Sequence, residues 1–134
     1  MNKKQIITQR QISKSKYDQN SRIHVNCVRF GRGETFEHAL TKFMLGWIVV
    51  SGGDVRIIYE SKLTKSFVKA TAEIFEESWR QWFFKGSERE FLTEAMTKDR
   101  KEIHDFVILD SGEVIEVVKS SDPPRKENVT RIEI

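Results

Sequence analysis

Four acidic side chains stand close together in one apolar stretch near the C-terminal end of the sequence, DFVILDSGEVIEVVK. They are Asp105, Asp110, Glu113 and Glu116. Carboxylates are hard oxygen ligands, and Mg²⁺ is commonly held by one or two of them together with water and substrate phosphate. Acids in such a stretch can equally form the solvated face of a hairpin. The elements that position these side chains decide between the two interpretations.

Two strands joined by a tight turn are predicted for this stretch, over residues 105–110 and 113–119. The connection at 110–112 is Asp-Ser-Gly, a combination of turn formers that favours an antiparallel hairpin. In such a hairpin the second strand runs back along the first. The turn therefore returns Glu116 towards Asp105, which begins the preceding strand.

Strand alternation divides the four acids into two kinds. Alternate residues of a strand share a face, so Glu116 shares its face with two valines. A carboxylate among apolar neighbours is costly unless its charge is compensated. Asp110 and Glu113 flank the turn and are predicted to face water. Asp105 and Glu116 are therefore the paired candidates for holding a metal ion.

A helix is predicted from Glu34 onward, where the period of the apolar residues changes. Its apolar stripe consists of Phe36, Ala39, Leu40, Phe43, Met44 and Trp47. Glu34 and Glu37 stand in the first turn, where the helix dipole favours carboxylates. The helix ends either at Gly46 or, after Val50, at the Ser-Gly-Gly sequence of residues 51–53.

The remaining segments add strands and one more helix. Strands are predicted over residues 23–30, 54–60, 91–97 and 128–134, the last at a sheet edge, and a second helix over 66–84. Elements of both types, with the strands clustered late, predict an α/β or α+β fold in which helices flank a central mixed sheet.

Basic charge is concentrated at the N-terminus. Of a formal net charge of +3, residues 1–32 contribute +7 through eight basic side chains and one acid, so the remainder is mildly acidic. Residues 1–22 are predicted to form a mobile basic arm, and residues 23–134 a single domain with a helical elaboration around 63–90. A basic arm on an acidic body suits a polyanion such as DNA. The candidate nucleic-acid-binding residues are Lys3, Lys4, Arg10, Lys14, Lys16 and Arg32.

Composition excludes several other classes of protein. A chain of 134 residues with 38% hydrophobic and 32% charged side chains is typical of one globular domain. No apolar run approaches the roughly 20 residues of a membrane span, and the N-terminal lysines precede no signal-peptide core. The single cysteine, Cys27, excludes an internal disulfide, so a reducing cytoplasm is expected. His24 and Cys27 are too few ligands for a structural zinc site. Phosphate-loop, dinucleotide and serine-nucleophile motifs are absent.

The order of these features resembles the PD-(D/E)XK, or restriction-endonuclease-like, nuclease superfamily, in particular its RecB-type and archaeal Holliday-junction-resolvase branches. The matching residues are Glu37 on the predicted helix, Asp105 in the sequence IHDFV, and Glu116 in VIEVVK. The resemblance covers about residues 33–120, with 51–90 as an insertion. It implies a restriction-endonuclease-like core in which the predicted strand FLTEAM leads into the aspartate.

The resemblance also implies an activity. Glu37, Asp105 and Glu116 would hold Mg²⁺ or Mn²⁺ in a nuclease that hydrolyses the phosphodiester bonds of DNA. Lys119 would stabilise charge on the phosphate. The family lysine normally lies two residues after the glutamate, a position held here by Val118. A β-bulge at residues 117–118 would bring Lys119 back to the required face. Other candidates for this cation are Lys42, Lys98 and Lys101.

Two further functions stay open beside the nuclease. If no lysine completes the site, the chain is a DNA-binding protein built on a degenerate nuclease fold. Alternatively it is a protein-interaction module that forms a homodimer through an aromatic cluster. That cluster, at residues 79–84, comprises Trp79, Trp82, Phe83 and Phe84.

A second Glu-x-Lys sequence competes with the hairpin motif. Glu60 and Lys62 form it, with Asp54 upstream. On one extended strand these two acids would lie roughly 20 Å apart, because each residue adds about 3.3 Å. They could not share one ion on a regular strand, so we expect a surface strand here.

Overall fold

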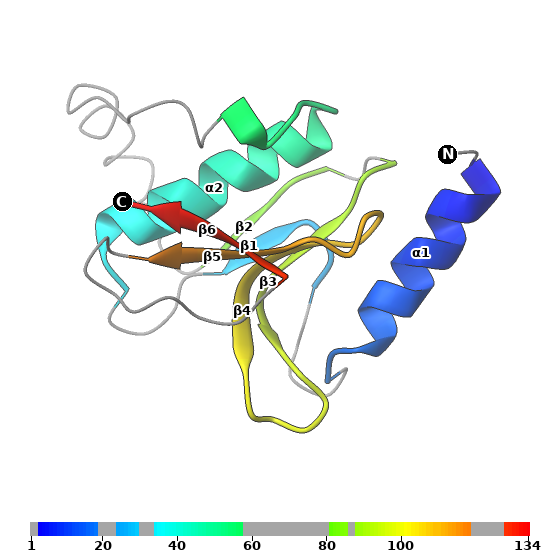
Figure 1. The fold of residues 1–134 in the computed structure, drawn as a ribbon. Coiled ribbons are helices and arrows are strands. Elements are labelled where there is room, and N and C mark those ends of the chain that lie inside the picture. The colour runs from blue at the N-terminus through cyan, green and yellow to red at the C-terminus, as the bar shows by residue number, and fades with distance from the viewer. Residues whose placement is uncertain (1–2, 19–23, 30–33, 58–80, 86–87, 119–127) are drawn as a thin grey trace.

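The structure is a computed structural model that describes residues 3–18, 24–29, 34–57, 81–85, 88–118 and 128–134. Within these ranges the chain has an α+β fold with two helices, a two-stranded sheet and a four-stranded mixed sheet (Figure 1). The elements are α1 (Lys3–Ser15), β1 (Cys27–Arg29), α2 (Phe36–Val50), β2 (Gln81–Phe83), β3 (Phe91–Met96), β4 (Ile103–Ile108), β5 (Val114–Val118) and β6 (Val129–Glu133). The predicted α+β class with a central mixed sheet is confirmed.

The four-stranded sheet has the order β3-β4-β5-β6. Its first three strands are antiparallel neighbours, and β6 runs parallel to β5 at the edge. The predicted hairpin is therefore present, with Phe106 opposite Ile115. Gly112 adopts a φ of 74°, which explains why the turn needs a glycine. The predicted edge strand at 128–134 is also present as β6.

Helix α2 is continuous through Gly46 and ends at Val50. Thr35 caps its beginning by accepting a hydrogen bond from the His38 N–H at 3.3 Å. The helix lies against Phe91 of the sheet at Gly46, which leaves no space for a side chain. A Cβ at this position would come within 2.8 Å of the Phe91 ring. Of the two predicted end points of this helix, the later one, at Val50, is therefore correct.

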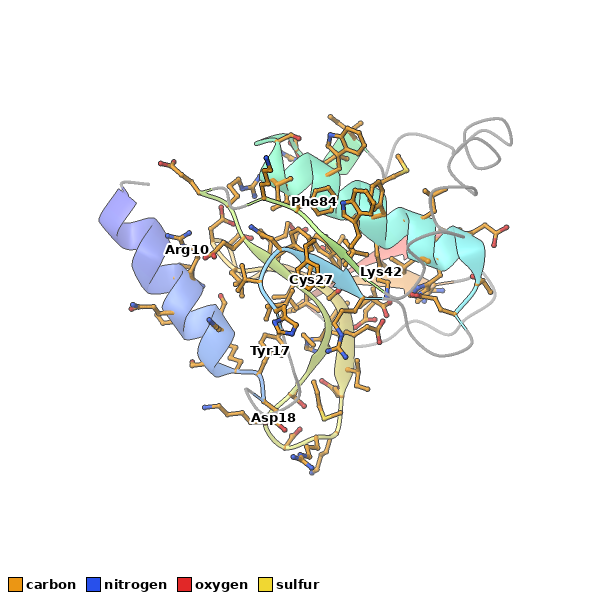
Figure 2. The ribbon with its side chains drawn as sticks, turned by 180° about the vertical axis from the view of Figure 1, so that it is seen from behind. Arg10, Tyr17, Asp18, Cys27, Lys42 and Phe84 are labelled. Atoms are coloured by element: carbon orange, nitrogen blue, oxygen red, sulfur yellow. The ribbon has the colours of Figure 1, made fainter. Side chains whose placement is uncertain are left out.

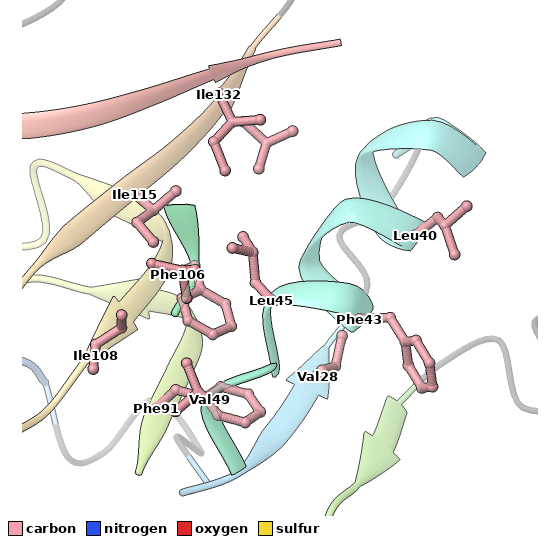
Figure 3. Close-up of a cluster of buried hydrophobic side chains, with 12 residues drawn as sticks. Val28, Leu40, Phe43, Leu45, Val49, Phe91, Phe106, Ile108, Ile115 and Ile132 are labelled. Atoms are coloured by element: carbon pink, nitrogen blue, oxygen red, sulfur yellow. The ribbon is translucent and has the colours of Figure 1, made fainter. Parts of the chain in front are cut away.

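Apolar side chains cover both faces of the four-stranded sheet. On one face, Leu45 and Val49 of α2 pack against Phe91 and Phe106, whose stacked rings lie 4.8 Å apart (Figure 3). On the other face the buried cluster consists of Tyr17, Leu92, Ala95, Val107 and Leu109. The two clusters place α2 and the segment that follows α1 on opposite sides of the sheet.

The described part of the segment predicted as a mobile N-terminal arm is a helix followed by chain that contacts the body. Residues 3–15 form α1, and the chain after it is fixed to the body. Tyr17 is only 2% exposed, and the Asp18 N–H donates to the Met96 carbonyl at 2.8 Å. Arg10 forms an ion pair with Glu90 at 3.1 Å. Order in this polar segment comes from tertiary contacts, which a low apolar content does not reveal.

Two further elements differ from the predictions. Residues 54–57 contain a turn and helical backbone at 56–57 instead of a strand, and 58–60 lie outside the described residues. The predicted helix over 66–84 lies outside them as far as residue 80, but its end is strand β2. There Trp82 pairs with Val28 of β1, and this pairing overrides the helical periodicity. Glu60 and Lys62 also lie outside the described residues.

Candidate functional site

The ladder between β3 and β4 is interrupted at one position. Thr93 pairs with Phe106, and Ala95 pairs with His104, but the register passes over Glu94 and Asp105 between them. Glu94 has a left-handed φ of 49°, a conformation that costs a non-glycine residue about 1–2 kcal/mol. The interruption breaks strand alternation. As a result, both carboxylates contact residues of α2.

Asp105 is held by a hydrogen bond from each of two elements. Its Oδ2 lies 2.8 Å from the Val117 N–H of β5 and 3.3 Å from Nε2 of His38. The side chain is 17% exposed. Burial alone would raise the pKa of this carboxyl, but the hydrogen bonds from His38, Val117 and Glu116 outweigh it and lower the pKa. Asp105 is therefore ionised at neutral pH.

Glu116 is adjacent to Asp105, as the hairpin register predicts. It is 7% exposed on β5, and its side chain is hydrogen bonded to the Asp105 carboxyl. On its other side, Glu116 is the register partner of Arg131 in β6. The structure thus brings the two predicted acids together, and their role as metal ligands stays a prediction.

Glu37 does not join this pair. It is exposed on α2, and its side chain has no ion pair with any residue in the described ranges. His38, the next residue, faces the sheet instead and bonds Asp105 through Nε2 and Glu34 through Nδ1. Burial lowers the pKa of His38, but these two carboxylates more than compensate and raise it to about 9. His38 is therefore an imidazolium at neutral pH.

Lys42 lies on the same face of α2, one turn further along, and is fully buried between helix and sheet (Figure 2). Its ammonium donates to the Arg29 carbonyl at 2.6 Å, to Glu34 at 2.7 Å and to Glu94 at 2.8 Å. An ammonium has three donors, and these three acceptors use them all. Lys42 therefore positions the acids around it and does not serve as a free cation for a phosphate.

The other candidates for the family lysine lie elsewhere. Val118 pairs regularly with Glu133, so the described part of β5 contains no bulge at 117–118. The bulge that would bring Lys119 back to the required face is therefore not seen in the ladder between β5 and β6. Lys119 lies outside the described residues. Lys98 and Lys101 are exposed in the turn between β3 and β4.

The predicted nucleic-acid-binding residues fall into three groups. Arg10 is engaged within the fold, because it donates to the Glu88 carbonyl at 2.8 Å and pairs with Glu90. Lys14 and Lys16 are exposed at the C-terminal end of α1. The backbones of Lys3 and Lys4 belong to α1, but their side chains are outside the description, as is Arg32.

Sequence reasoning missed Glu34 and Glu94 and left His38 without a role. A signal for two of these residues was present, because Glu34, His38 and Lys42 are spaced by four and share one helix face. Glu94 carried a weaker signal as an acid inside an apolar strand. Its connection to Lys42 depends on the interrupted ladder, which residue spacing does not predict.

The donor set fits a divalent ion held mainly by water and substrate. Among the described residues, no group of three or more His, Cys, Asp or Glu side chains is arranged to bind a metal. Mg²⁺ nevertheless commonly uses only one or two carboxylates, and Asp105 with Glu116 supplies two from adjacent strands. The residues present therefore fit Mg²⁺ or Mn²⁺ but would not form a closed cage around it.

Aromatic side chains form a second feature, away from the acids. Trp82 and Phe84 pack on Phe43 of α2, with ring centroids 5.6 Å and 5.4 Å apart, respectively. Phe83 is 55% exposed. Trp79 lies outside the described residues, and the homodimer through this cluster stays a prediction.

Comparisons with known proteins leave the family undetermined. No family model, curated protein or solved structure matches the chain. In the ranges that the structure describes, no helix is both long and apolar enough to cross a membrane.

Proposed function

We propose that this chain is a metal-dependent DNA nuclease of the PD-(D/E)XK type with a restriction-endonuclease-like core. The observation that carries the proposal is the pair Asp105–Glu116 on adjacent strands, in which Glu116 is buried and Asp105 half-buried, with the His38 imidazolium beside Asp105. The order of elements adds support. A helix with one acid in its first turn, Glu37, precedes the aspartate strand, and the glutamate strand follows across a hairpin, as the resemblance implies.

Electrostatics favours a cation at this pair. Two neighbouring carboxyls with little solvent exposure are costly when both are charged, unless a proton or a cation compensates. Bound there, Mg²⁺ or Mn²⁺ would polarise the scissile phosphate and lower the pKa of an attacking water. Asp105 and Glu116 would hold the ion, and the Val117 N–H fixes the orientation of Asp105.

The residues of α2 supply positive charge and order around the acids. His38 places its imidazolium beside Asp105, where it would stabilise negative charge that develops on a phosphate. Glu34 binds both His38 and Lys42, and so fixes the imidazole ring. In this proposal His38 takes the role that the family assigns to its lysine, and Glu34, which lies just before the N-cap of α2, replaces Glu37 as the acid from this part of the chain.

A cleavage assay with Mg²⁺ or Mn²⁺ on duplex, single-stranded and branched DNA tests the proposal. We expect Asp105→Ala and Glu116→Gln each to abolish cleavage, and His38→Gln to reduce it by a factor of roughly 10²–10³. Glu37→Gln is the matched control, because it changes an exposed acid on the same helix and should retain activity. Equal cleavage by wild type and Asp105→Ala contradicts the catalytic role of Asp105. The absence of cleavage by both proteins contradicts it as well.

The second candidate function is DNA binding without cleavage. Val118 in the family's lysine position and the fully engaged Lys42 ammonium favour it. A degenerate nuclease fold should bind DNA equally well in EDTA and in Mg²⁺, and its affinity should fall steeply with salt. Cleavage that depends on Asp105 excludes this alternative.

A further inference from the structure

We infer that the end of α1 and the β3–β4 turn together form one basic surface that binds the phosphate backbone of duplex DNA. The surface is defined by Lys16, Lys98 and Lys101. This inference deepens the proposed function, because it assigns the substrate's backbone a place beside the acidic pair. Only Lys16 belongs to the basic N-terminal segment, so the sequence alone does not assemble this surface.

Backbone contacts fix the two parts of the surface to each other. Tyr17 forms an antiparallel bridge with Thr97, and the Asp18 N–H donates to the Met96 carbonyl at 2.8 Å. The Lys98 N–H donates to the Lys16 carbonyl at 3.2 Å. The two segments that carry these lysines are far apart in the sequence but are joined by backbone hydrogen bonds. Figure 2 shows Tyr17 and Asp18 at this end of α1, beside the turn.

Two acids of this region, Asp99 and Asp18, are engaged by local contacts. The Asp99 carboxylate accepts from the Thr97 hydroxyl at 2.6 Å and from the Lys101 N–H at 2.9 Å, so it stabilises the turn. Asp18 is 9% exposed and pairs with Arg100 at 3.0 Å. Neither carboxylate pairs with the ammonium of a surface lysine in these contacts.

The lysines themselves face solvent. Lys16, Lys98 and Lys101 are exposed, and their ammonium groups form no ion pair with the residues that the structure describes. A lysine ammonium on its flexible stem binds a phosphate as a point charge without reading the base. Three such contacts predict a salt dependence of log K close to −2.7, at about −0.9 for each phosphate.

The sequence separation of Lys101 and Asp105 limits how far the surface can lie from the acidic pair. Lys101 precedes Asp105 by four residues, which span at most roughly 13 Å even in a fully extended chain. About four nucleotides of one duplex strand span that length, at 3.4 Å each. A backbone seated on Lys101 would therefore lie within about four nucleotides of Asp105. Neither the His38 nor the Lys42 network is needed for this binding.

Fluorescence anisotropy with a labelled DNA duplex in EDTA tests the surface without cleavage. The triple variant Lys16→Gln/Lys98→Gln/Lys101→Gln should bind about a hundredfold more weakly at 0.1 M salt, and its salt slope should fall by roughly 2.7. Lys85→Gln is the control, since it removes an exposed lysine beyond β2, outside the surface. Unchanged binding by the triple variant, or an equal loss with Lys85→Gln, overturns the inference.

Two further arms separate this inference from the proposed function. Asp105→Ala should keep its duplex affinity in EDTA even where cleavage is lost. A wild type that binds through these lysines but never cleaves DNA supports the surface and refutes the nuclease. Binding to vesicles that contain anionic phospholipid, with no binding to duplex DNA, refutes the surface as a DNA site.

Discussion

At the residue scale, the site depends on cations that hold acids in place. Lys42 is the most buried of them, and it joins Glu34 near the start of α2 to Glu94 of β3. Removing one partner of a buried ion pair leaves uncompensated charge, which usually costs about 3–5 kcal/mol. The interrupted ladder adds strain at Glu94, and this network offsets it.

Lys42→Met should therefore lower the free energy of unfolding by about 3–5 kcal/mol, because Glu34 and Glu94 would lose their shared cation. Urea denaturation at neutral pH measures the change. Lys98→Met removes an exposed lysine from the β3–β4 turn and should alter stability by no more than about 0.5 kcal/mol. Equal effects of the two variants contradict a structural role for the buried ammonium.

Tyr17 provides a pH dependence that reports on the packing of the segment after α1. Burial, reinforced by the nearby Glu116 carboxylate, raises its pKa to about 12. The folded state thus keeps the phenol proton longer than the unfolded state, whose tyrosine titrates near about 10. Its stabilising contribution is complete below about pH 10 and is lost as the pH rises towards 12.

Absorbance titration at about 295 nm in a Tyr59→Phe background isolates Tyr17, because the chain has only two tyrosines. We expect ionisation near pH 12, or together with alkaline unfolding if unfolding comes first. The Tyr17→Phe single variant, which retains Tyr59, identifies the other transition. A Tyr17 transition near about pH 10 in a folded protein would show that the phenol is not buried.

At the element scale, local patterns predicted some elements well and others poorly. The apolar stripe of α2 and the Asp-Ser-Gly turn are readable in the sequence, and so is the meeting of Asp105 with Glu116. Strand β2 has only three residues and depends on its partner β1, which no local pattern specifies. The contact of Asp105 with α2 depends on the left-handed conformation at Glu94. Regular strand alternation would instead direct Asp105 to the opposite face of the sheet.

Close packing of α2 on the sheet predicts an unusual response at Gly46. In an exposed helix, Gly→Ala stabilises by about 1 kcal/mol. Here the new Cβ would come within 2.8 Å of Phe91, whose buried ring is stacked on Phe106 and has little room to move. We expect Gly46→Ala to destabilise the protein by about 1–3 kcal/mol in thermal or urea unfolding.

The double variant Gly46→Ala/Phe91→Leu provides the control for that clash. The Phe91→Leu change would cost stability alone but would relieve the contact with the new methyl group, so the two changes should cost less together than their separate costs predict. If the costs of the two changes are additive, the strain caused by Gly46→Ala does not come from the contact with Phe91.

At the scale of the whole molecule, the four-stranded sheet is buried on both faces, and the N-terminal segment is part of that burial. Tyr17 belongs to the apolar cluster with Leu92, Val107 and Leu109, on the face opposite α2. Deleting residues 1–18 should therefore expose this face and lower the free energy of unfolding by about 3 kcal/mol or more, as loss of a large buried side chain does.

The measurement is urea unfolding of the truncated and full-length chains, with binding of a hydrophobic dye as a second readout of the exposed face. Arg10→Ala is the matched control. It removes the ion pair to Glu90 but leaves Tyr17 in place, so it should cost about 1 kcal/mol or less. If residues 1–18 were a free arm, their deletion would change neither the free energy of unfolding nor the dye binding, because an arm without contacts contributes no buried area. A large effect of truncation beside a small effect of Arg10→Ala would instead show that the segment after α1 is structural, since it buries Tyr17 against the sheet and holds Lys16 beside Lys98.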